Sequence, residues 1–270
     1  MKQRILTALV LAPLAVAAVL WLPTGAFLML AAALLLLGLW EWTRLIGLRG
    51  HARRAIVLLA HAGVLAWLAW RGTGLIPWIA VLGAAWWCLA ALWLRRMEFG
   101  QADRPANRAM KLGIGSVMVV PAWSAAAVLH SDGASGPAWT LYALLLVWAA
   151  DSGAWFVGSR VGGKKLAPSI SPGKTWAGFW GGLATVALVA LVAVPVFGLT
   201  WSQAPALLAA SLLTGLASVV GDLFESIIKR HAGAKDSGYL VPGHGGVLDR
   251  IDSVLAALPV FVVAQGGFNL

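Results

Sequence analysis

Long runs of apolar residues, separated by short polar segments, dominate the chain. Nine runs approach or exceed the roughly 20 residues that a helix needs to cross a bilayer. They lie at 5–22, 25–43, 55–70, 75–94, 112–129, 138–157, 176–199, 204–226 and 251–268. The hydrocarbon core offers no hydrogen-bond partner to open backbone groups, so each run should be helical. The pattern predicts an all-α, polytopic membrane protein with about nine transmembrane helices.

Composition agrees with this pattern. Only 11% of the 270 residues are charged and 60% are hydrophobic, whereas a soluble domain averages about 25% charged residues. The first run follows Lys2 and Arg4, as in a signal peptide, but it is longer than the roughly 7–15 apolar residues of such a segment. We therefore interpret it as a membrane anchor. No repeat or linker divides the chain, and we expect one integral membrane domain over residues 1–270.

The basic residues predict an orientation. With the N-terminus in the cytosol and nine alternating spans, 19 of the 20 Lys and Arg residues fall in cytosolic segments, and only Arg71 lies outside. This is the distribution that the positive-inside rule describes, and it predicts an N-in, C-out protein. The net charge of +10 then reflects topology, with a secondary attraction to anionic headgroups. We expect no nucleic-acid partner, because no basic module with interleaved aromatic residues is present.

Tryptophan and cysteine give two smaller expectations. Many of the 16 Trp residues sit near span ends, which is typical of an interfacial belt: Trp21, Trp40, Trp42, Trp70, Trp78, Trp139, Trp176 and Trp201. Cys88 is the only cysteine, so it forms neither an intramolecular disulfide nor a thiolate metal cluster. Its apolar surroundings predict a buried structural residue.

Two acids lie inside apolar runs. Asp151 precedes Arg160 by nine residues, and Asp222 precedes Lys229 by seven, which places both roughly 10–14 Å along a helix from the basic edge. An ionised carboxylate at that depth is costly unless it meets a cation or a water-filled cavity, so such acids indicate a functional site. The alternative is a polar contact between helices or a neutral carboxyl.

A pair of acids begins the last span. Asp249 and Asp252 are three residues apart and would share one face of a helix. Such a pair can bind Mg²⁺, which takes one or two carboxylates together with substrate phosphate. Asp222 and Glu225 form a second pair of this spacing. A solvated helix terminus is the alternative; the two intramembrane acids favour the metal site.

Two polar segments suit phosphate. His244, Gly245 and Gly246 precede the last span, where glycine lets backbone amides approach an anion and the helix N-terminus attracts it. His244 could equally be a loop residue without a further function. The loop from Arg160 to Trp176 contains Ser171 and Lys174 and ends in Gly-Lys-Thr. It is no ATPase loop, since Pro168 stands where that motif requires glycine. A phosphate clasp is favoured over a plain basic loop.

Charged residues concentrate between Ser226 and Asp252, which predicts a metal-and-phosphate site. The stretch resembles the signature of phosphatidate cytidylyltransferases (CDP-diacylglycerol synthases), S-x-x-K-R-x4-K-D-x-G followed by P-x-H-G-G-x-x-D-R-x-D. Val241 is a minor departure. The resemblance extends upstream through Gly221-Asp222-Leu223, the segment 171–176 and residues 150–153, and so covers about the last 120 residues. The first 110 residues are similar mainly in span layout and in Glu41-Trp42.

The resemblance implies a reaction. This family makes CDP-diacylglycerol and pyrophosphate from CTP and phosphatidic acid, with Mg²⁺ and a second cation in a cytosol-facing cavity, as a homodimer in the membrane. It implies catalytic spans and cytosolic loops in 112–270, after N-terminal spans in 1–111, and a bacterial cytoplasmic (inner) membrane location. The positions that match its metal-binding acids are Asp222 and Asp249.

The remaining site residues are assigned by their chemistry. Asp151 and Asp252 would bind the metal or support its ligands, and Lys229 and Arg250 join Asp222 and Asp249 as catalytic candidates. Cations must neutralise the triphosphate and the lipid phosphate. The substrate-binding candidates are Ser171, Lys174, Arg230, Lys235, His244, Gly245 and Gly246.

Two other classes remain open. A CDP-alcohol phosphatidyltransferase or a prenyltransferase also uses D-x-x-D acids and Mg²⁺, but the former carries D-G-x-x-A-R, which is absent from this sequence. An ion-coupled transporter would suit the intramembrane acids and glycine-rich segments, yet it predicts repeated halves with matching broken helices. Here the acids cluster in the last 120 residues.

Overall fold

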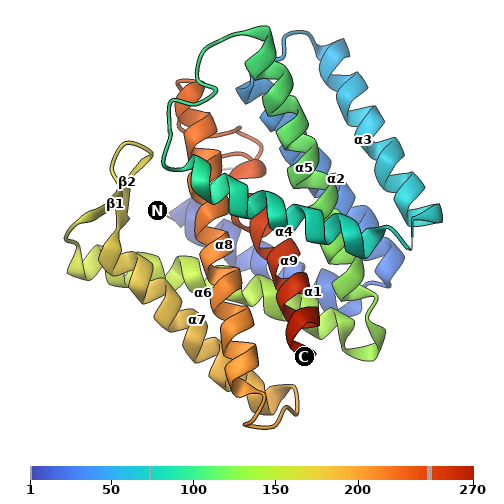
Figure 1. Cartoon of the computed structure of the whole chain (residues 1–270), viewed down its shortest axis with the longest axis vertical. Coiled ribbons are helices and arrows are strands. Elements are labelled where there is room, and N and C mark those ends of the chain that lie inside the picture. Colours follow the sequence, from blue (N-terminus) through green and yellow to red (C-terminus); the bar gives the residue numbers. More distant parts are fainter. Residues whose placement is uncertain (1, 73, 242–244) are drawn as a thin grey trace.

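The computed structural model describes residues 2–72, 74–241 and 245–270 and is largely helical (Figure 1). The described residues form nine α-helices and a 3₁₀ helix, η1 (Gly133–Ser135). The α-helices are α1 (Lys2–Trp21), α2 (Thr24–Leu45), α3 (His51–Arg71), α4 (Ile76–Trp93), α5 (Pro105–His130), α6 (Gly136–Val161), α7 (Trp176–Val196), α8 (Ala204–His231) and α9 (Leu248–Phe268). Each predicted apolar run coincides with one of these helices.

Fewer helices have the length and hydropathy of a membrane span than the nine α-helices that the described residues form. Among the described residues, eight helices, α2 to α9, are long and apolar enough to cross a bilayer; η1 directly precedes α6 and extends that stretch to Gly133–Val161. In α1 the qualifying apolar part is the shorter segment Leu9–Trp21. The structure thus supports a polytopic membrane protein with eight candidate spans.

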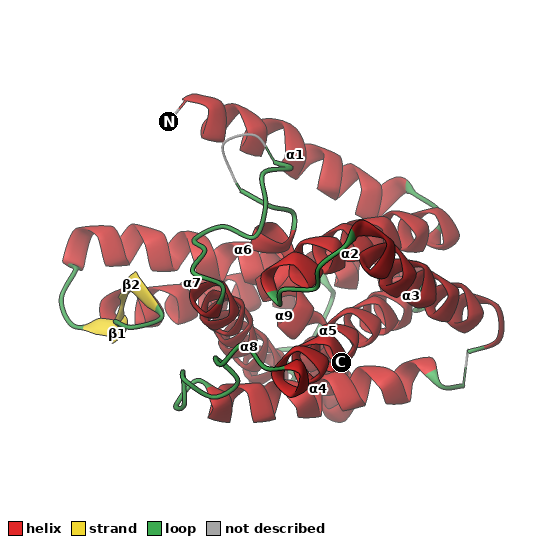
Figure 2. Ribbon diagram, turned by 90° about the horizontal axis from the view of Figure 1, so that it is seen from above, coloured by secondary structure: helices red, strands yellow, loops and turns green. Residues whose placement is uncertain are grey.

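A small β-hairpin departs from the all-α prediction. Strands β1 (Lys165–Ala167) and β2 (Ser171–Thr175) pair antiparallel, with Lys165 opposite Thr175. Gly162 and Gly163 both adopt positive φ angles, which glycine tolerates, and turn the chain away from α6. Thr175 then caps α7, because its Oγ1 accepts a hydrogen bond of 3.0 Å from the amide of Gly178. The hairpin projects at the edge of the molecule opposite α3 (Figures 1 and 2).

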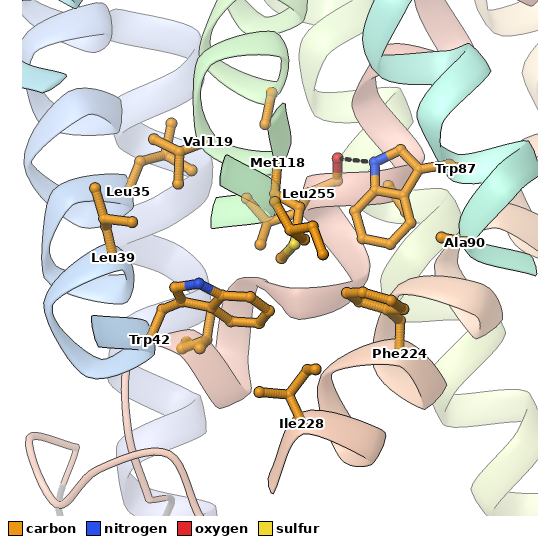
Figure 3. Packing of buried hydrophobic residues seen from close by; sticks show 14 of the residues in the cluster. Leu35, Leu39, Trp42, Trp87, Ala90, Met118, Val119, Phe224, Ile228 and Leu255 are labelled. Atoms are coloured by element: carbon orange, nitrogen blue, oxygen red, sulfur yellow. Dashed lines mark hydrogen bonds between the residues drawn. The ribbon is translucent and has the colours of Figure 1, made fainter. Parts of the chain in front are cut away.

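An aromatic cluster holds the second half of α8 in place. Phe224 is fully buried and meets the rings of Trp86, Trp87 and Trp93 edge to face, at centroid distances of 5.9, 5.9 and 5.5 Å. Such geometry is favourable for aromatic pairs. Trp42 packs nearby, and Figure 3 shows Trp87 donating from Nε1 to the carbonyl oxygen of Leu255 at 2.9 Å. Helices α2, α4 and α9 thereby fix the turn of α8 that carries Asp222 and Glu225.

Two of the minor sequence predictions are wrong in part. Trp42 and Trp139 are buried core residues, not members of an interfacial belt, whereas Trp21, Trp70, Trp78 and Trp201 are largely exposed. Cys88 is exposed on α4, because the neighbouring Trp87, and not Cys88, faces the core. Position along a span alone does not tell which side of a helix packs against the bundle.

Helices α6 and α7 pack along one another through small residues. A Cβ atom on Gly181 would lie 2.5 Å from Cβ of Val157, and one on Gly153 would clash with Thr185. The glycines let the two backbones approach, as is common where helices meet in membranes. This close contact sets the position of Asp151, which α6 carries.

Substituting Gly181 with leucine is expected to destabilise the protein by about 1–3 kcal/mol, because the added side chain overfills the α6–α7 contact. Thermal unfolding in detergent would show a lower midpoint than that of the wild type. Gly113→Leu on α5 is the matched control, since nothing lies within 4 Å of a Cβ there. Equal midpoints for the two variants would contradict the close packing.

The loops that carry most basic residues meet at one end of the bundle. Arg44 donates to the carbonyl oxygen of Ser237, Arg230 donates from Nε to that of Ile170 at 3.1 Å, and His231 hydrogen-bonds to that of Met97 at 2.6 Å. These contacts join the segments 44–50, 94–104, 162–175 and 232–241. The α7–α8 connection and the C-terminus lie at the opposite end (Figure 1).

Candidate active site

The first ion pair of the site joins the hairpin to α8. Lys174 of β2 binds Oδ2 of Asp222, and each side chain is about a quarter exposed, at 28% and 27%. The other oxygen of Asp222, Oδ1, accepts a long hydrogen bond of 3.4 Å from Ser226. Asp222 is therefore paired with a cation and keeps acceptor capacity on Oδ1.

The second ionic contact of the site joins one cation to two carboxylates. Lys229 lies one turn beyond Glu225 on α8 and contacts its Oε2, and it also donates to Oδ1 of Asp249 at 2.7 Å. All three side chains are buried or nearly so. Oε1 of Glu225 has no hydrogen-bond partner among the residues that the structure describes. Removing Lys229 would leave two buried charges without a counter-ion.

Backbone amides hold the other oxygen of Asp249. Its Oδ2 accepts from the amides of Ser237 and Gly246, at 2.9 and 2.8 Å, and lies 2.9 Å from the Ser237 hydroxyl. Gly245 has a positive φ of 85°, and a Cβ there would be 2.7 Å from Oδ2. The Gly-Gly segment thus wraps the carboxylate at the start of α9, so the Gly246 amide, predicted to contact phosphate, donates to Asp249 here.

Asp151 and Asp252 complete the set of predicted acids. Asp151 is exposed on α6 and lines a groove of about 620 Å³ with Trp155 and Thr185. It is close enough to Asp222, Lys174 and Arg250 for their charges to interact. Asp252 is buried and interacts in the same way with Asp222 and Lys229. The acids of α6, α8 and α9 therefore lie within range of one another's charges. Within residues 2–72, 74–241 and 245–270, however, no three acidic, His or Cys side chains converge as a metal site.

The predicted basic residues divide into two sets. Lys174, Lys229 and Arg250 lie with the acids. Arg230 instead donates to the backbone carbonyls of Ile170 and Ala234, and the exposed Lys235 lines a separate pocket of about 420 Å³ beside Arg44. Ser171 starts β2, three residues before Lys174. His244 lies outside the described residues.

Sequence reasoning missed three buried residues of this region. Glu225 is in contact with Lys229, while Glu41 and Ser237 join the network around Asp249. The sequence singles out Glu225 only as the partner of Asp222 in a spaced pair, and Glu41 only through the family resemblance. The signal that could have identified Glu225 and Glu41 is an acid within or at the end of an apolar run.

The Cytidylyltransferase family model matches residues 2–266, almost the whole chain. The chain belongs to the cytidylyltransferase family. A phosphatidate cytidylyltransferase of Pseudomonas aeruginosa is 39% identical over 261 residues, which cover 97% of this chain and 95% of that protein. The protein of the same name from Haemophilus influenzae is 34% identical, with 97% of each chain covered. A Bacillus subtilis protein of that name is 45% identical over 128 residues, 46% of each chain.

These matches confirm the family resemblance seen in the signature, and they extend it over the N-terminal spans. The chain is therefore an enzyme of this family, and its residues Lys229 and Asp249, both part of the signature, are in direct contact. The two rival transferase classes and the transporter lose their support, because full-length relatives carry a different name.

Proposed function

We propose that the protein transfers CMP from CTP to phosphatidic acid and releases pyrophosphate, at the cytosolic face of a bacterial inner membrane. The observation that carries this proposal is the full-length similarity to two proteins named phosphatidate cytidylyltransferase. The grouping of Lys174, Lys229 and Arg250 with four acids supports a site for an anionic substrate and a cation. The product is CDP-diacylglycerol.

Little proton chemistry is needed from the protein. The second pKa of a phosphate monoester is about 6, so the lipid phosphate is already anionic at neutral pH. An oxygen of the lipid phosphate attacks the α-phosphorus of CTP. The bond from the α-phosphorus to the oxygen that bridges it to the β-phosphate breaks, and pyrophosphate leaves. The difficulty is to bring one anion onto another, so that catalysis depends on positioning and charge neutralisation. Lys174, Lys229 and Arg250 are the cations placed to supply it.

The carboxylates fit Mg²⁺. Asp222 keeps acceptor capacity on Oδ1, and Oδ1 of Asp249 accepts from the ammonium group of Lys229, so each carboxylate already lies beside a cation. Mg²⁺ prefers oxygen ligands and combines one or two carboxylates with water and substrate phosphates. Asp222 and Asp249 would hold it, supported by Asp151 and Asp252, and a second cation would share the group. When bound, Mg²⁺ neutralises charge on the triphosphate.

An N-in, C-out arrangement with nine spans is part of the proposal. The loops with most basic residues meet at one end, where Arg44, Arg230 and His231 tie them together. Under the positive-inside rule that end faces the cytosol, on the side where CTP is available. A homodimer is also proposed, on the family resemblance.

Purified protein supplied with phosphatidic acid and CTP is expected to release pyrophosphate with Mg²⁺ and to release none with EDTA, since the metal neutralises the triphosphate. CTP labelled in the α-phosphate separates the alternatives. Label in a lipid product supports the proposal. A CDP-alcohol phosphatidyltransferase would leave CTP unchanged and would instead release CMP from added CDP-diacylglycerol and an alcohol. Ion flux into proteoliposomes without CTP would indicate a transporter.

Cross-linking in the membrane tests the homodimer.

A further inference from the structure

A buried carboxylate from the N-terminal half of the chain reaches the active-site loop. Glu41 on α2 is only 3% exposed. Its Oε2 accepts a hydrogen bond of 2.8 Å from the amide of Leu248, the first residue of α9, and one of 2.9 Å from the hydroxyl of Ser237. The partners are 207 and 196 residues away in the sequence. A contact of this kind is made only by the folded bundle.

Ser237 connects Glu41 to Asp249. Its hydroxyl lies 2.9 Å from Oδ2 of Asp249, its amide donates to the same oxygen at 2.9 Å, and its Oγ accepts from the Asp249 amide at 3.3 Å. The Ser237 side chain is completely buried. Arg44, one turn beyond Glu41, holds the carbonyl oxygen of Ser237. Two residues at the end of α2 thus contact Ser237, one at its hydroxyl group and one at its carbonyl oxygen, and Ser237 in turn contacts Asp249.

The loop backbone is shaped around the Glu41 carboxyl group. A Cβ atom on Gly238 would clash with its Oε1, and one on Gly246 would clash with its Oε2. Both glycines belong to the family signature, and this carboxyl, together with the Ser237 hydroxyl beside Gly246, leaves no room there for a side chain. In the described part of the chain, Oε1 has no hydrogen-bond partner. A buried, half-satisfied carboxyl costs stability, so a residue kept there for packing alone would be apolar.

We propose that Glu41 is a positioning residue, which acts through Ser237 to hold Asp249 in the orientation that metal and substrate binding require. The proposal rests on the proposed function, since it concerns the same carboxylate. Helix α2 lies in the half of the chain where the signature is absent. Under this proposal, the hydrogen bonds of Glu41 connect α2 directly to the active site. Glu41 itself contacts neither substrate nor metal.

The test compares Glu41→Ala, Glu41→Gln and the control Glu98→Ala, an exposed acid at the same end of the bundle. Glutamine can still accept from Leu248 and Ser237 through its amide oxygen. Glu41→Ala is expected to lower kcat by about 10- to 100-fold, since small misplacements at a reacting centre cost this much. It should also raise the Mg²⁺ concentration for half-maximal rate, with a smaller change in the KM for CTP. Glu41→Gln should recover most of the kcat and most of the Mg²⁺ dependence of the wild type, and Glu98→Ala should match the wild type.

Hydrogen exchange of the Ser237, Gly246 and Leu248 amides provides a readout independent of activity. It should accelerate in Glu41→Ala while α6 keeps its protection, and the combined effect of Glu41→Ala and Ser237→Ala should be smaller than the sum of the two single effects. Wild-type exchange and Mg²⁺ dependence in Glu41→Ala, or additive effects of the two substitutions, would overturn the proposal. If the wild type transferred no CMP, the proposed function would fail, and the exchange data would still decide whether Glu41 holds the loop.

Discussion

Replacing Lys229 with methionine is expected to destabilise the protein by about 3–5 kcal/mol, the usual cost of removing one partner from a buried ion pair. The side chain of Lys229 is the shared counter-ion of Glu225 and Asp249, and both carboxylates are almost inaccessible to water. Methionine has a similar length, so packing is retained while the charge is lost. CMP transfer should fall below detection, because the substrate phosphates lose a cation and Asp249 loses its partner.

A second variant separates stability from catalysis. Lys229→Met combined with Glu225→Gln removes one of the two orphaned charges, so the unfolding midpoint in detergent should rise above that of Lys229→Met alone. Activity should stay absent, since the cation is still missing. Arg96→Met, which removes an exposed charge at the same end of the molecule, should resemble the wild type in both measurements. A fully active Lys229→Met variant would contradict the assignment of Lys229 to the site.

The second large effect is expected from Asp249→Asn, which should lower Mg²⁺-dependent CMP transfer by at least about 100-fold. Asparagine is nearly isosteric, and its oxygen can still accept from the amides of Ser237 and Gly246. Lys229 keeps Glu225 as a partner. The variant should therefore insert and fold, while the negative charge proposed to bind the metal is gone.

Two measurements check this expectation. CMP transfer should be lost at every Mg²⁺ concentration, and the rise in unfolding temperature that Mg²⁺ with CTP produces in the wild type should shrink in the variant. Asp103→Asn is the control, because Asp103 is exposed and pairs with Arg108 in the α4–α5 region, at 2.6 Å. Full activity of Asp249→Asn would end its assignment as a metal ligand.

Hydropathy located the helices well but predicted several of them too short. The predicted run 204–226 corresponds to α8, which continues to His231, and the run 112–129 corresponds to α5, which already begins at Pro105. An apolar run ends where polar residues begin, whereas a helix continues as long as its polar residues find partners. In α8 those partners are Asp249 for Lys229, the Ile170 carbonyl for Arg230 and the Met97 carbonyl for His231.

The β-hairpin was not predicted from the sequence, for a related reason. Residues 165–175 are too few and too polar to show a strand alternation, so the sequence predicts a loop there. Two positive-φ glycines and the extended Thr175 nonetheless fold them into a two-stranded ribbon that brings Lys174 to Asp222. The sequence singles out Lys174 through its motif but does not identify its partner, Asp222.

The site was predicted best where charge is rare. Asp222, Lys229 and Asp249 stand out because an ionised group beside long apolar runs needs a compensating partner. Arg230 and Lys235 belong to the same motif, yet the structure gives them backbone contacts and a separate pocket. A motif records which residues occur together and does not distinguish those that face the acids from those that support the loops.

The sequence by itself determined the membrane character, the approximate helices, the side on which basic loops gather and the family, because these depend on local hydropathy, charge and an uninterrupted signature. Only the tertiary structure decided which lysine pairs with which carboxylate, and that Glu41 reaches across the bundle to Ser237 and α9. Those contacts join residues up to 207 positions apart. They depend on how helices pack around Phe224 and on where glycine lets two backbones meet, and no local pattern encodes either.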